Sequence, residues 1–306
     1  MTSRPLFAIL CKLGSILAFL GMASLIKVTA DSVPPGEAVF FRSFFAIPVI
    51  LGWLWFRQEL ATGFKTDNPM GHFWRGLVGT TAMGLYFTGL GLLPLPEVTA
   101  IGYAAPLFIV IFAAMFLGEQ VRLFRLTAVG MGMVGIMIVL SPRLSVGIVD
   151  VDPSMALGAM AVFGGAVFAA LAQVFIRKLT MSESTSTIVF WFSVTASLLS
   201  LITLYWGWVV PTPTEAALLI GSGLLGGVGQ ILLTSGYRFG DASLVAPFEY
   251  ASMIFALIIG YVAFDEIPTM TTVWGALIII AAGVLIIWRE RQLGLERAKQ
   301  RRANTP

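Results

Sequence analysis

The sequence predicts an all-α integral membrane protein in which ten transmembrane helices form two inverted five-helix repeats. Of its 306 residues, 58% are hydrophobic and only 11% are charged, whereas a soluble domain carries about 25% charged residues. Lipid must therefore be the main solvent, and in lipid a helix satisfies its own backbone hydrogen bonds. The apolar runs are long and continuous rather than alternating, which argues against a β-barrel.

An internal duplication is the second observation. Each copy has a long apolar run, a short acidic break and another apolar run. Aligning Glu119 with Glu266 gives an offset of 147 positions, which also pairs Tyr103 with Tyr250. Each run has about the 20 residues that a helix needs to cross a bilayer. The two copies are residues 96–140 and 243–287.

The first half of the chain supplies five spans. Its first run follows Arg4 as a signal peptide would, but nine comparable runs follow, so we interpret it as an uncleaved membrane helix. Turn-forming Pro, Gly, Asn and Asp residues mark the breaks. The longest polar connection, residues 57–71, is too short for a soluble domain. The predicted spans are residues 7–29, 34–56, 72–93, 96–117 and 121–140.

The second half repeats this plan after a join near residues 147–153. Because five is an odd number, the second half must enter the membrane from the opposite side. Such inverted repeats are typical of secondary transporters with a site at the repeat interface. The predicted spans are residues 155–178, 187–209, 214–236, 242–264 and 270–288. The expected units are a first repeat (1–147), a second repeat (153–290) and a basic cytoplasmic tail (291–306) attracted to anionic lipid.

Lysine and arginine positions predict the orientation. With the N-terminus in the cytoplasm, 16 of the 19 Lys and Arg residues fall on the inner side, Lys12 and Arg75 among them. Lys27 and Arg143 fall on the outer side, and Arg42 lies within a span. This bias predicts a multi-pass protein of a bacterial-type inner membrane with both termini in the cytoplasm.

Two ionisable residues, Arg42 and Glu249, lie deep in predicted spans, where charges are costly and usually face a cavity or a partner. Arg42 is roughly 12 Å from the outer end of its span. Neither residue recurs in the other repeat, because Gly102 matches Glu249, and Phe192 matches Arg42 at a looser offset of 150. Both are therefore candidates for substrate or proton binding. The alternatives are a buried Arg–Glu pair that fixes helix packing, or an arginine that reaches outward.

Further candidate substrate contacts are aromatic or amide residues. Tyr86, Tyr103 and Tyr250 lie deeper than an interfacial aromatic belt requires, so they could stack on a flat substrate or pack in the core. Gln173 and Gln230 also lie within spans, where hydrogen bonding between helices is the alternative.

Other charged residues lie near the ends of spans. Interfacial solvation explains Lys27, Glu37 and Glu97, which need no functional role on this interpretation. Glu119 and Glu266 are interpreted as turn residues that cap or solvate helix ends, since acidic residues favour helix N-termini.

Interior prolines and glycines predict departures from straight helices. Pro48, Pro106 and Pro247 each lack a backbone donor and are expected to kink their spans. A kink at Pro247 would free backbone carbonyls beside Glu249. The glycines of residues 221–229 give a small face that lets helices approach closely. No strand precedes this run, so we reject a nucleotide-binding loop there.

The composition excludes several functions. The single cysteine, Cys11, excludes an intrachain disulfide. The only histidine, His72, lies at an inner edge where solvation explains it. We expect no metal, no cofactor and no nucleic-acid partner. No catalytic set or ATP-binding motif is present, so we predict a carrier rather than an enzyme, driven by an ion gradient, with proton coupling as one option, or by exchange. Its partners would be a small-molecule substrate and the lipid bilayer, as a monomer or homodimer.

Residues 7–290 resemble the EamA family of the drug/metabolite transporter superfamily. The resemblance rests on the two five-helix repeats and on the segment GEAVFFRSFFAIPVI in the second span. It rests also on the Leu-Gly-Glu break ending at Glu119, echoed by the Phe-Asp-Glu break ending at Glu266. The family implies inner-membrane carriers for amino acids, nucleotide-like metabolites, vitamins or drugs, often exporters, with a cavity between the repeats. The first span has no acidic residue, so the mechanism of the small multidrug members does not carry over.

These observations predict a secondary transporter of small metabolites, an exporter or exchanger, with amino acids as the preferred substrates. A zwitterion needs both signs of charge, which Arg42 and Glu249 supply. The alternatives are a carrier for riboflavin, S-adenosylmethionine or a drug, and then a passive channel or a membrane enzyme.

Overall fold

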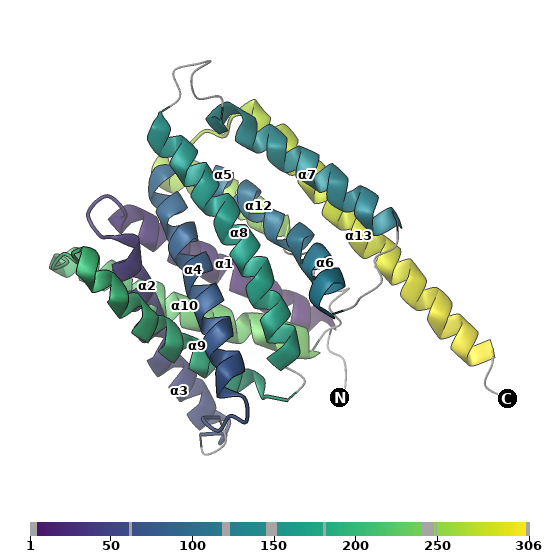
Figure 1. Cartoon of the computed structure of the whole chain (residues 1–306), viewed down its shortest axis with the longest axis horizontal. Coiled ribbons are helices and arrows are strands. Elements are labelled where there is room, and N and C mark those ends of the chain that lie inside the picture. The colour runs from purple at the N-terminus through teal and green to yellow at the C-terminus, as the bar shows by residue number, and fades with distance from the viewer. Residues whose placement is uncertain are drawn as a thin grey trace.

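The computed structural model describes residues 5–60, 63–117, 123–144, 152–179, 182–239, 248 and 250–303. Across these residues every regular element is a helix (Figure 1), which confirms the predicted all-α class. The α-helices are α1 (Pro5–Thr29), α2 (Pro35–Phe44), α3 (Ala46–Phe56), α4 (Pro69–Leu92), α5 (Leu95–Gly102), α6 (Ala104–Leu117), α7 (Leu123–Leu144), α8 (Pro153–Leu179), α9 (Thr185–Ser200), α10 (Pro213–Phe239), α12 (Ala251–Phe264) and α13 (Met270–Ala303), and a 3-10 helix, η1 (Leu201–Trp206), follows α9.

Helix length and apolar composition mark this chain as a multi-pass membrane protein. Within the described residues, six stretches are long and apolar enough to cross a bilayer, and three shorter apolar helices accompany them. The expected ten spans remain a prediction. The six stretches are Leu6–Thr29, Pro35–Phe56, Leu95–Phe116, Pro153–Ile176, Ser186–Trp206 and Pro213–Leu233. The three shorter helices are Thr127–Pro142, Ala251–Phe264 and Met270–Leu285.

Two predicted spans are each split into two helices. The second span breaks at Phe45, between α2 and α3, and the fourth breaks at Tyr103, between α5 and α6. Each break lies three residues before a proline, Pro48 or Pro106. A proline has no N–H group, and its ring clashes with the carbonyl of the fourth residue before it. The predicted kinks at these prolines are therefore confirmed, whereas Pro247 lies outside the described residues.

The helices pack in a pattern that relates the two halves of the chain. The most extensive contacts join α1 to α10, α4 to α8, and α7 to α13, and α2 packs on α9 (Figure 1). Exchanging the first and second halves converts the α1–α10 pair into the α8–α4 pair and returns the other two pairs to themselves. This pattern fits a two-fold relation between halves, and the inversion itself stays a prediction.

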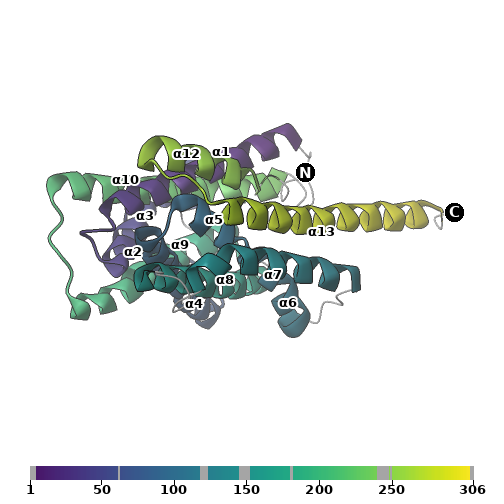
Figure 2. The same cartoon turned by 90° about the horizontal axis from the view of Figure 1, so that it is seen from above.

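The α7–α13 contact depends on two glycines that face each other. A Cβ atom on Gly135 would lie 2.8 Å from the Gly275 carbonyl oxygen, and one on Gly275 would lie 2.7 Å from the Gly135 carbonyl oxygen. Only glycine allows two backbones to approach this closely. Beyond this contact α13 continues to Ala303, so residues 291–303 of the predicted tail prolong the last helix and extend past its neighbours (Figure 2).

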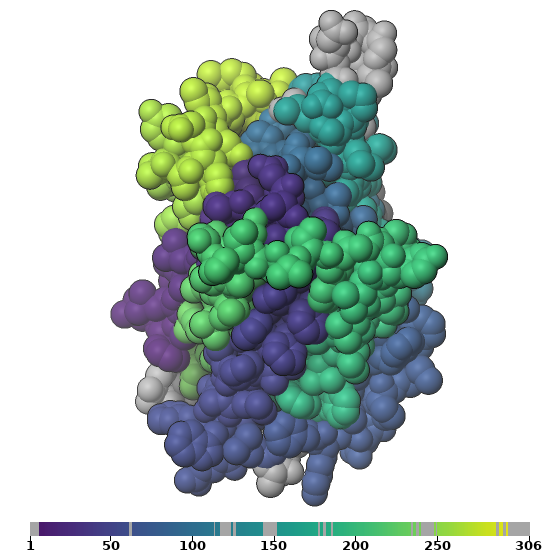
Figure 3. Space-filling view, turned by 90° about the vertical axis from the view of Figure 1, so that its left-hand side faces the viewer, coloured from purple at the N-terminus to yellow at the C-terminus, as the bar shows by residue number. Residues whose placement is uncertain are grey.

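The connection from α9 to α10 covers the beginning of α2. Figure 3 shows this connection (green) lying across first-half helices (purple). The buried carboxylate of Glu37 accepts a hydrogen bond from the Val209 N–H at 3.1 Å. The Trp208 ring lies 5.2 Å from the ring of Phe40. The interfacial solvation expected for Glu37 is therefore wrong, because a second-half loop closes over it.

Candidate functional site

Arg42 lies in α2 and is only 6% exposed. Its Nε is buried without a hydrogen-bond partner, and its Cζ lies 5.8 Å from the centre of the Phe192 ring on α9. A Cβ atom on Gly226 of α10 would lie 3.1 Å from the Arg42 Nε. Within the part of the chain that the structure describes, no carboxylate pairs with this guanidinium. Arg42 thus faces the interior, so an outward-reaching arginine is excluded.

Arg75 lies beside it, although the sequence placed this residue only among the inner-side charges. Asn68 caps α4 by accepting a hydrogen bond from Gly71 N, so Arg75 belongs to the second turn of that helix and is only 7% exposed. Its Cζ lies 3.3 Å from the centre of the Phe192 ring. The Nε and Nη1 atoms are buried without partners. From the sequence, Arg75 was counted only by membrane side and was not identified as a candidate site residue.

Arg42, Arg75 and the ring of Phe192 together form what we call the arginine pair. The two positive charges lie close enough to repel each other. Gly79, one turn after Arg75, makes room for the arrangement, because a Cβ atom there would lie 2.9 Å from both the Arg75 Nη1 and the Phe192 ring. The neighbouring hydroxyl of Ser43 is also buried without a partner. The site is cationic, nearly dry and able to donate several hydrogen bonds.

Two predicted site residues, Tyr103 and Tyr250, touch each other. Their rings lie 5.4 Å apart in an edge-to-face arrangement. The Tyr103 hydroxyl shares a 2.7 Å hydrogen bond with the hydroxyl of Ser252 and donates to the Tyr250 carbonyl at 3.4 Å. The Tyr250 hydroxyl lies against Gly283 on α13. The duplicated tyrosines thus meet between the α5–α6 break and the start of α12, while Glu249 lies outside the described residues.

The other predicted site residues lie on three different helices. Tyr86, on α4, is partly buried and packs against the main apolar core. Gln230, on α10, is partly buried, whereas Gln173, on α8, is exposed. Lys12, which was counted among the inner-side charges, is buried within α1.

An ion pair links the two halves at the opposite end of α1 from Lys12. Lys27 Nζ lies 2.9 Å from Glu266 Oε1 and donates to the carbonyls of Leu90 at 3.0 Å and Leu93 at 2.6 Å. Glu266 Oε2 accepts from Leu95 N at 2.7 Å, which caps α5. The interfacial solvation predicted for Lys27 is therefore wrong. The prediction that Glu266 caps a helix end is confirmed, although the capped helix, α5, belongs to the other half of the chain.

Glu97 and Glu119 are the remaining acidic residues that were predicted to lie near the ends of spans. Glu97 is buried at the start of α5, so interfacial solvation was wrong for it too. Glu119 lies outside the described residues.

Glu183, in the connection between α8 and α9, binds the connection that precedes α4. Its Oε1 accepts from Thr66 Oγ1 at 2.6 Å, Asp67 N at 2.9 Å and Asn68 N at 3.1 Å. Burial raises the pKa of Glu183, but these hydrogen bonds outweigh that effect and hold it below its ordinary value. His72 Nε2 lies 3.8 Å from the same carboxylate. The solvation expected for His72 was wrong, because it is buried here.

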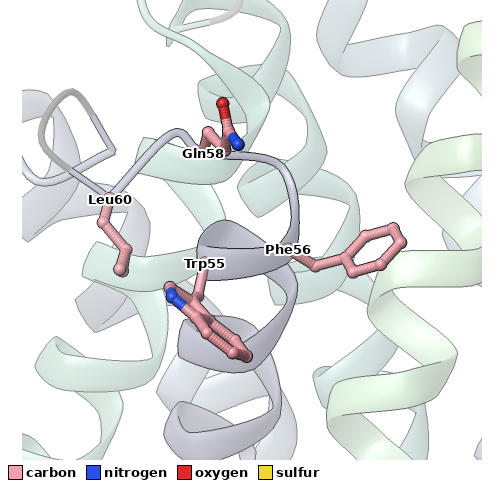
Figure 4. Close-up of a pocket in the computed structure, with 4 residues that line it drawn as sticks. All are labelled: Trp55, Phe56, Gln58 and Leu60. Carbon is pink, nitrogen blue, oxygen red and sulfur yellow. The ribbon is translucent and has the colours of Figure 1, made fainter.

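An open hollow of about 500 Å³ lies at the end of α3. It is lined by Trp55, Phe56, Gln58 and Leu60, whose side chains diverge rather than converge (Figure 4). Trp55 and Phe56 are among the most exposed large apolar residues, as expected of aromatic residues at a membrane interface. The hollow offers one amide and no charge, so the arginine pair is the better candidate site.

Comparisons with known proteins agree with this membrane architecture. The profile of the family described as "EamA-like transporter family" matches residues 6–141 and 156–288. An S-adenosylmethionine uptake transporter of Rickettsia bellii (strain RML369-C) is 30% identical over 256 residues, which is 84% of each chain. A pseudopaline exporter of Pseudomonas aeruginosa (strain UCBPP-PA14) is 30% identical over 284 residues, 90% of this chain and 96% of that one. A solved crystal structure aligns with a TM-score of 0.66 at 22% identity, covering 94% of this chain and 98% of that one, and shows the shared fold.

Proposed function

Because the chain belongs to the EamA-like transporter family, we propose that it is a secondary transporter of small metabolites bearing a carboxylate, with amino acids as the preferred substrates. One observation carries this proposal, the buried guanidinium of Arg42, which has no carboxylate partner among the described residues. An unpaired buried charge is costly. A guanidinium also matches a carboxylate through two parallel hydrogen bonds. A substrate carboxylate would supply the missing partner.

S-adenosylmethionine is the second candidate, because a relative that is 30% identical is named as its uptake transporter. Its α-carboxylate and α-ammonium groups are those of an amino acid, so Arg42 could bind both classes in the same way. The two named relatives move their substrates in opposite directions. We therefore propose exchange or export for this chain and test both directions.

Glu249 is proposed to bind the substrate ammonium or to exchange a proton for substrate, and Tyr103 and Tyr250 are proposed as substrate contacts. Tyr86, Gln173 and Gln230 are proposed as further contacts. The place of Glu249 deep in a predicted span, where ionisable residues commonly serve proton or substrate pathways, supports this proposal. In a Glu249→Gln variant, loss of pH-driven accumulation with retained counterflow would support proton exchange, whereas loss of both would support ammonium binding. Unchanged rates and pH dependence would refute both roles.

The proposed carrier has two inverted repeats, residues 1–147 and 153–290, in a bacterial inner membrane with both termini inside. The two stretches that match the family profile and the exchangeable helix pairs support this arrangement. A reporter fused at Pro306 that is active only in the periplasm should be silent. An active reporter would refute the orientation.

The decisive experiment is counterflow in proteoliposomes with a panel of amino acids, S-adenosylmethionine and riboflavin. The control is Arg57→Ala, because Arg57 pairs with Glu59 at a half-exposed position. We expect Arg42→Ala to lose most counterflow while keeping its folded yield, and Arg57→Ala to behave as the wild type. Poor folding with normal transport per folded molecule would make Arg42 a packing residue. Absence of saturable counterflow for every compound would refute the proposed function.

A further inference from the structure

The strongest feature that the proposed function does not use is the second arginine. Arg75 stacks flat on Phe192, since its Cζ lies 3.3 Å from the ring centre. Stacking occupies the face of a guanidinium and leaves the N–H groups of its edge free to bind a carboxylate. Two of these donor atoms, Nε and Nη1, are buried and find no acceptor among the described residues. Arg75 is therefore poised to bind an anion rather than committed to a structural ion pair.

Arg42 approaches the same ring from α2, with its Cζ 5.8 Å from the ring centre. The two guanidinium groups consequently lie within reach of one small molecule. Each is more than nine-tenths buried, and each raises the electrostatic cost of the other because like charges repel in a dry environment. A ligand with one carboxylate would neutralise one arginine and leave the other unpaired, whereas two anionic groups would neutralise both.

We propose that Arg42, Arg75 and Phe192 form one subsite for a substrate with two carboxylates, so that acidic amino acids or their derivatives are the substrate class. The inference rests on the proposed transport function, and it narrows the ligand. Both guanidinium groups lie near the Phe192 ring, which would contact the carbon chain that joins the two carboxylates.

Two nearby glycines allow the helix backbones to approach this subsite closely. A Cβ atom on Gly79 would lie 2.9 Å from both the Arg75 Nη1 and the Phe192 ring. A Cβ atom on Gly226 would lie 3.1 Å from the Arg42 Nε. Side chains at these two positions would push the guanidinium groups out of place, so glycine at both positions preserves the convergence of α2, α4, α9 and α10.

The test compares acids with their own amides, which differ in charge but hardly in shape. Thermal unfolding of the purified wild-type protein is measured with L-glutamate against L-glutamine, L-aspartate against L-asparagine, and with succinate and glutarate as bare dicarboxylates. Counterflow competition is measured with the same compounds. We expect each acid to bind about ten- to a hundredfold more tightly than its amide, as charged hydrogen bonds predict.

The variants are Arg75→Gln, Arg75→Lys and, as the matched control, Arg57→Gln. We expect Arg75→Gln to abolish the preference for acids while neutral amino acids are still transported, Arg75→Lys to keep part of it, and Arg57→Gln to keep all of it.

If the wild type treats each acid and its amide alike while transporting both, the two-carboxylate inference is wrong and the proposed function stands. If dicarboxylates stabilise the protein but nothing is transported, the subsite stands and the proposed function fails. If no dicarboxylate stabilises the wild type, the inference is overturned whether or not the variants fold.

Discussion

The ion pair between Lys27 and Glu266 should be among the costliest polar contacts to remove. All three ammonium protons of Lys27 have an acceptor, namely Glu266 Oε1 and the carbonyls of Leu90 and Leu93. Replacing Lys27 by Met fills the same space but leaves a carboxylate oxygen and two carbonyls without their donor. Breaking a fully buried pair costs about 3–5 kcal/mol. With side-chain exposures of 13% and 14%, we expect about 2–3 kcal/mol.

Glu266→Gln should cost less than Lys27→Met. The amide oxygen still accepts from Leu95 N, and only the charge is lost, so we expect about 1–2 kcal/mol. The double variant should cost less than the sum of the two single variants, by roughly 1–2 kcal/mol of coupling. Chemical unfolding of the purified protein in detergent micelles measures all three free energies of unfolding.

A second ion pair provides the matched control. Arg57 and Glu59 lie 2.7 Å apart but are 26% and 34% exposed, so their single variants should each cost less than about 1 kcal/mol. Equal costs for the two pairs, or no measurable coupling between Lys27 and Glu266, would refute the reasoning that burial and the two carbonyl acceptors set the magnitude.

Three further predictions follow from single contacts. The hydrogen bonds to Glu183 lower its pKa below 4.5, so their stabilising contribution is complete above that pH and is lost as the pH falls below it. The free energy of unfolding, measured against pH, should show this loss in the wild type and not in Glu183→Gln. Gly283→Ala puts a methyl group where the Tyr250 hydroxyl lies, so the melting temperature should fall by the equivalent of about 1–3 kcal/mol. It should recover in part when Tyr250→Ala is added. An unchanged melting temperature would show that the Tyr250 ring moves freely. Glu37→Ala should cost about 1–3 kcal/mol by leaving Val209 N–H without its acceptor, whereas Glu37→Gln should cost under about 1 kcal/mol; equal costs would assign the effect to the charge.

The features that the sequence predicted correctly depend on local chemistry. An excess of apolar residues requires helices in lipid wherever the chain folds. Pro48 and Pro106 break their helices because each proline acts on the turn that precedes it, whatever packs around it. The offset of 147 positions paired Tyr103 with Tyr250, and these two residues are in contact in the structure.

The features that the sequence missed depend on which helix faces which. Arg75 lies near the end of a predicted span, and distance from that end cannot tell a solvated arginine from one that stacks on Phe192 of α9. Lys27 was expected to be solvated for the same reason, since its partner Glu266 comes from the other half of the chain. In both cases the deciding contact joins segments far apart in sequence, and hydrophobic periodicity carries no information about it.

The burial of Arg75 also bears on how the chain enters the bilayer during synthesis. An arginine at the centre of a helix raises the free energy of insertion from the translocon by about 2.5–3.5 kcal/mol, and Arg75, in the second turn of α4, adds a smaller cost of the same kind. With Arg75, His72 and its many glycines, α4 is not among the six stretches of the described residues that are long and apolar enough to cross a bilayer. Its main packing partners, α8 and α9, are made later by the ribosome. A nascent chain that ends before α8 therefore leaves α4 without its two main packing partners, and we expect α4 to become stable across the membrane only when the second half covers it.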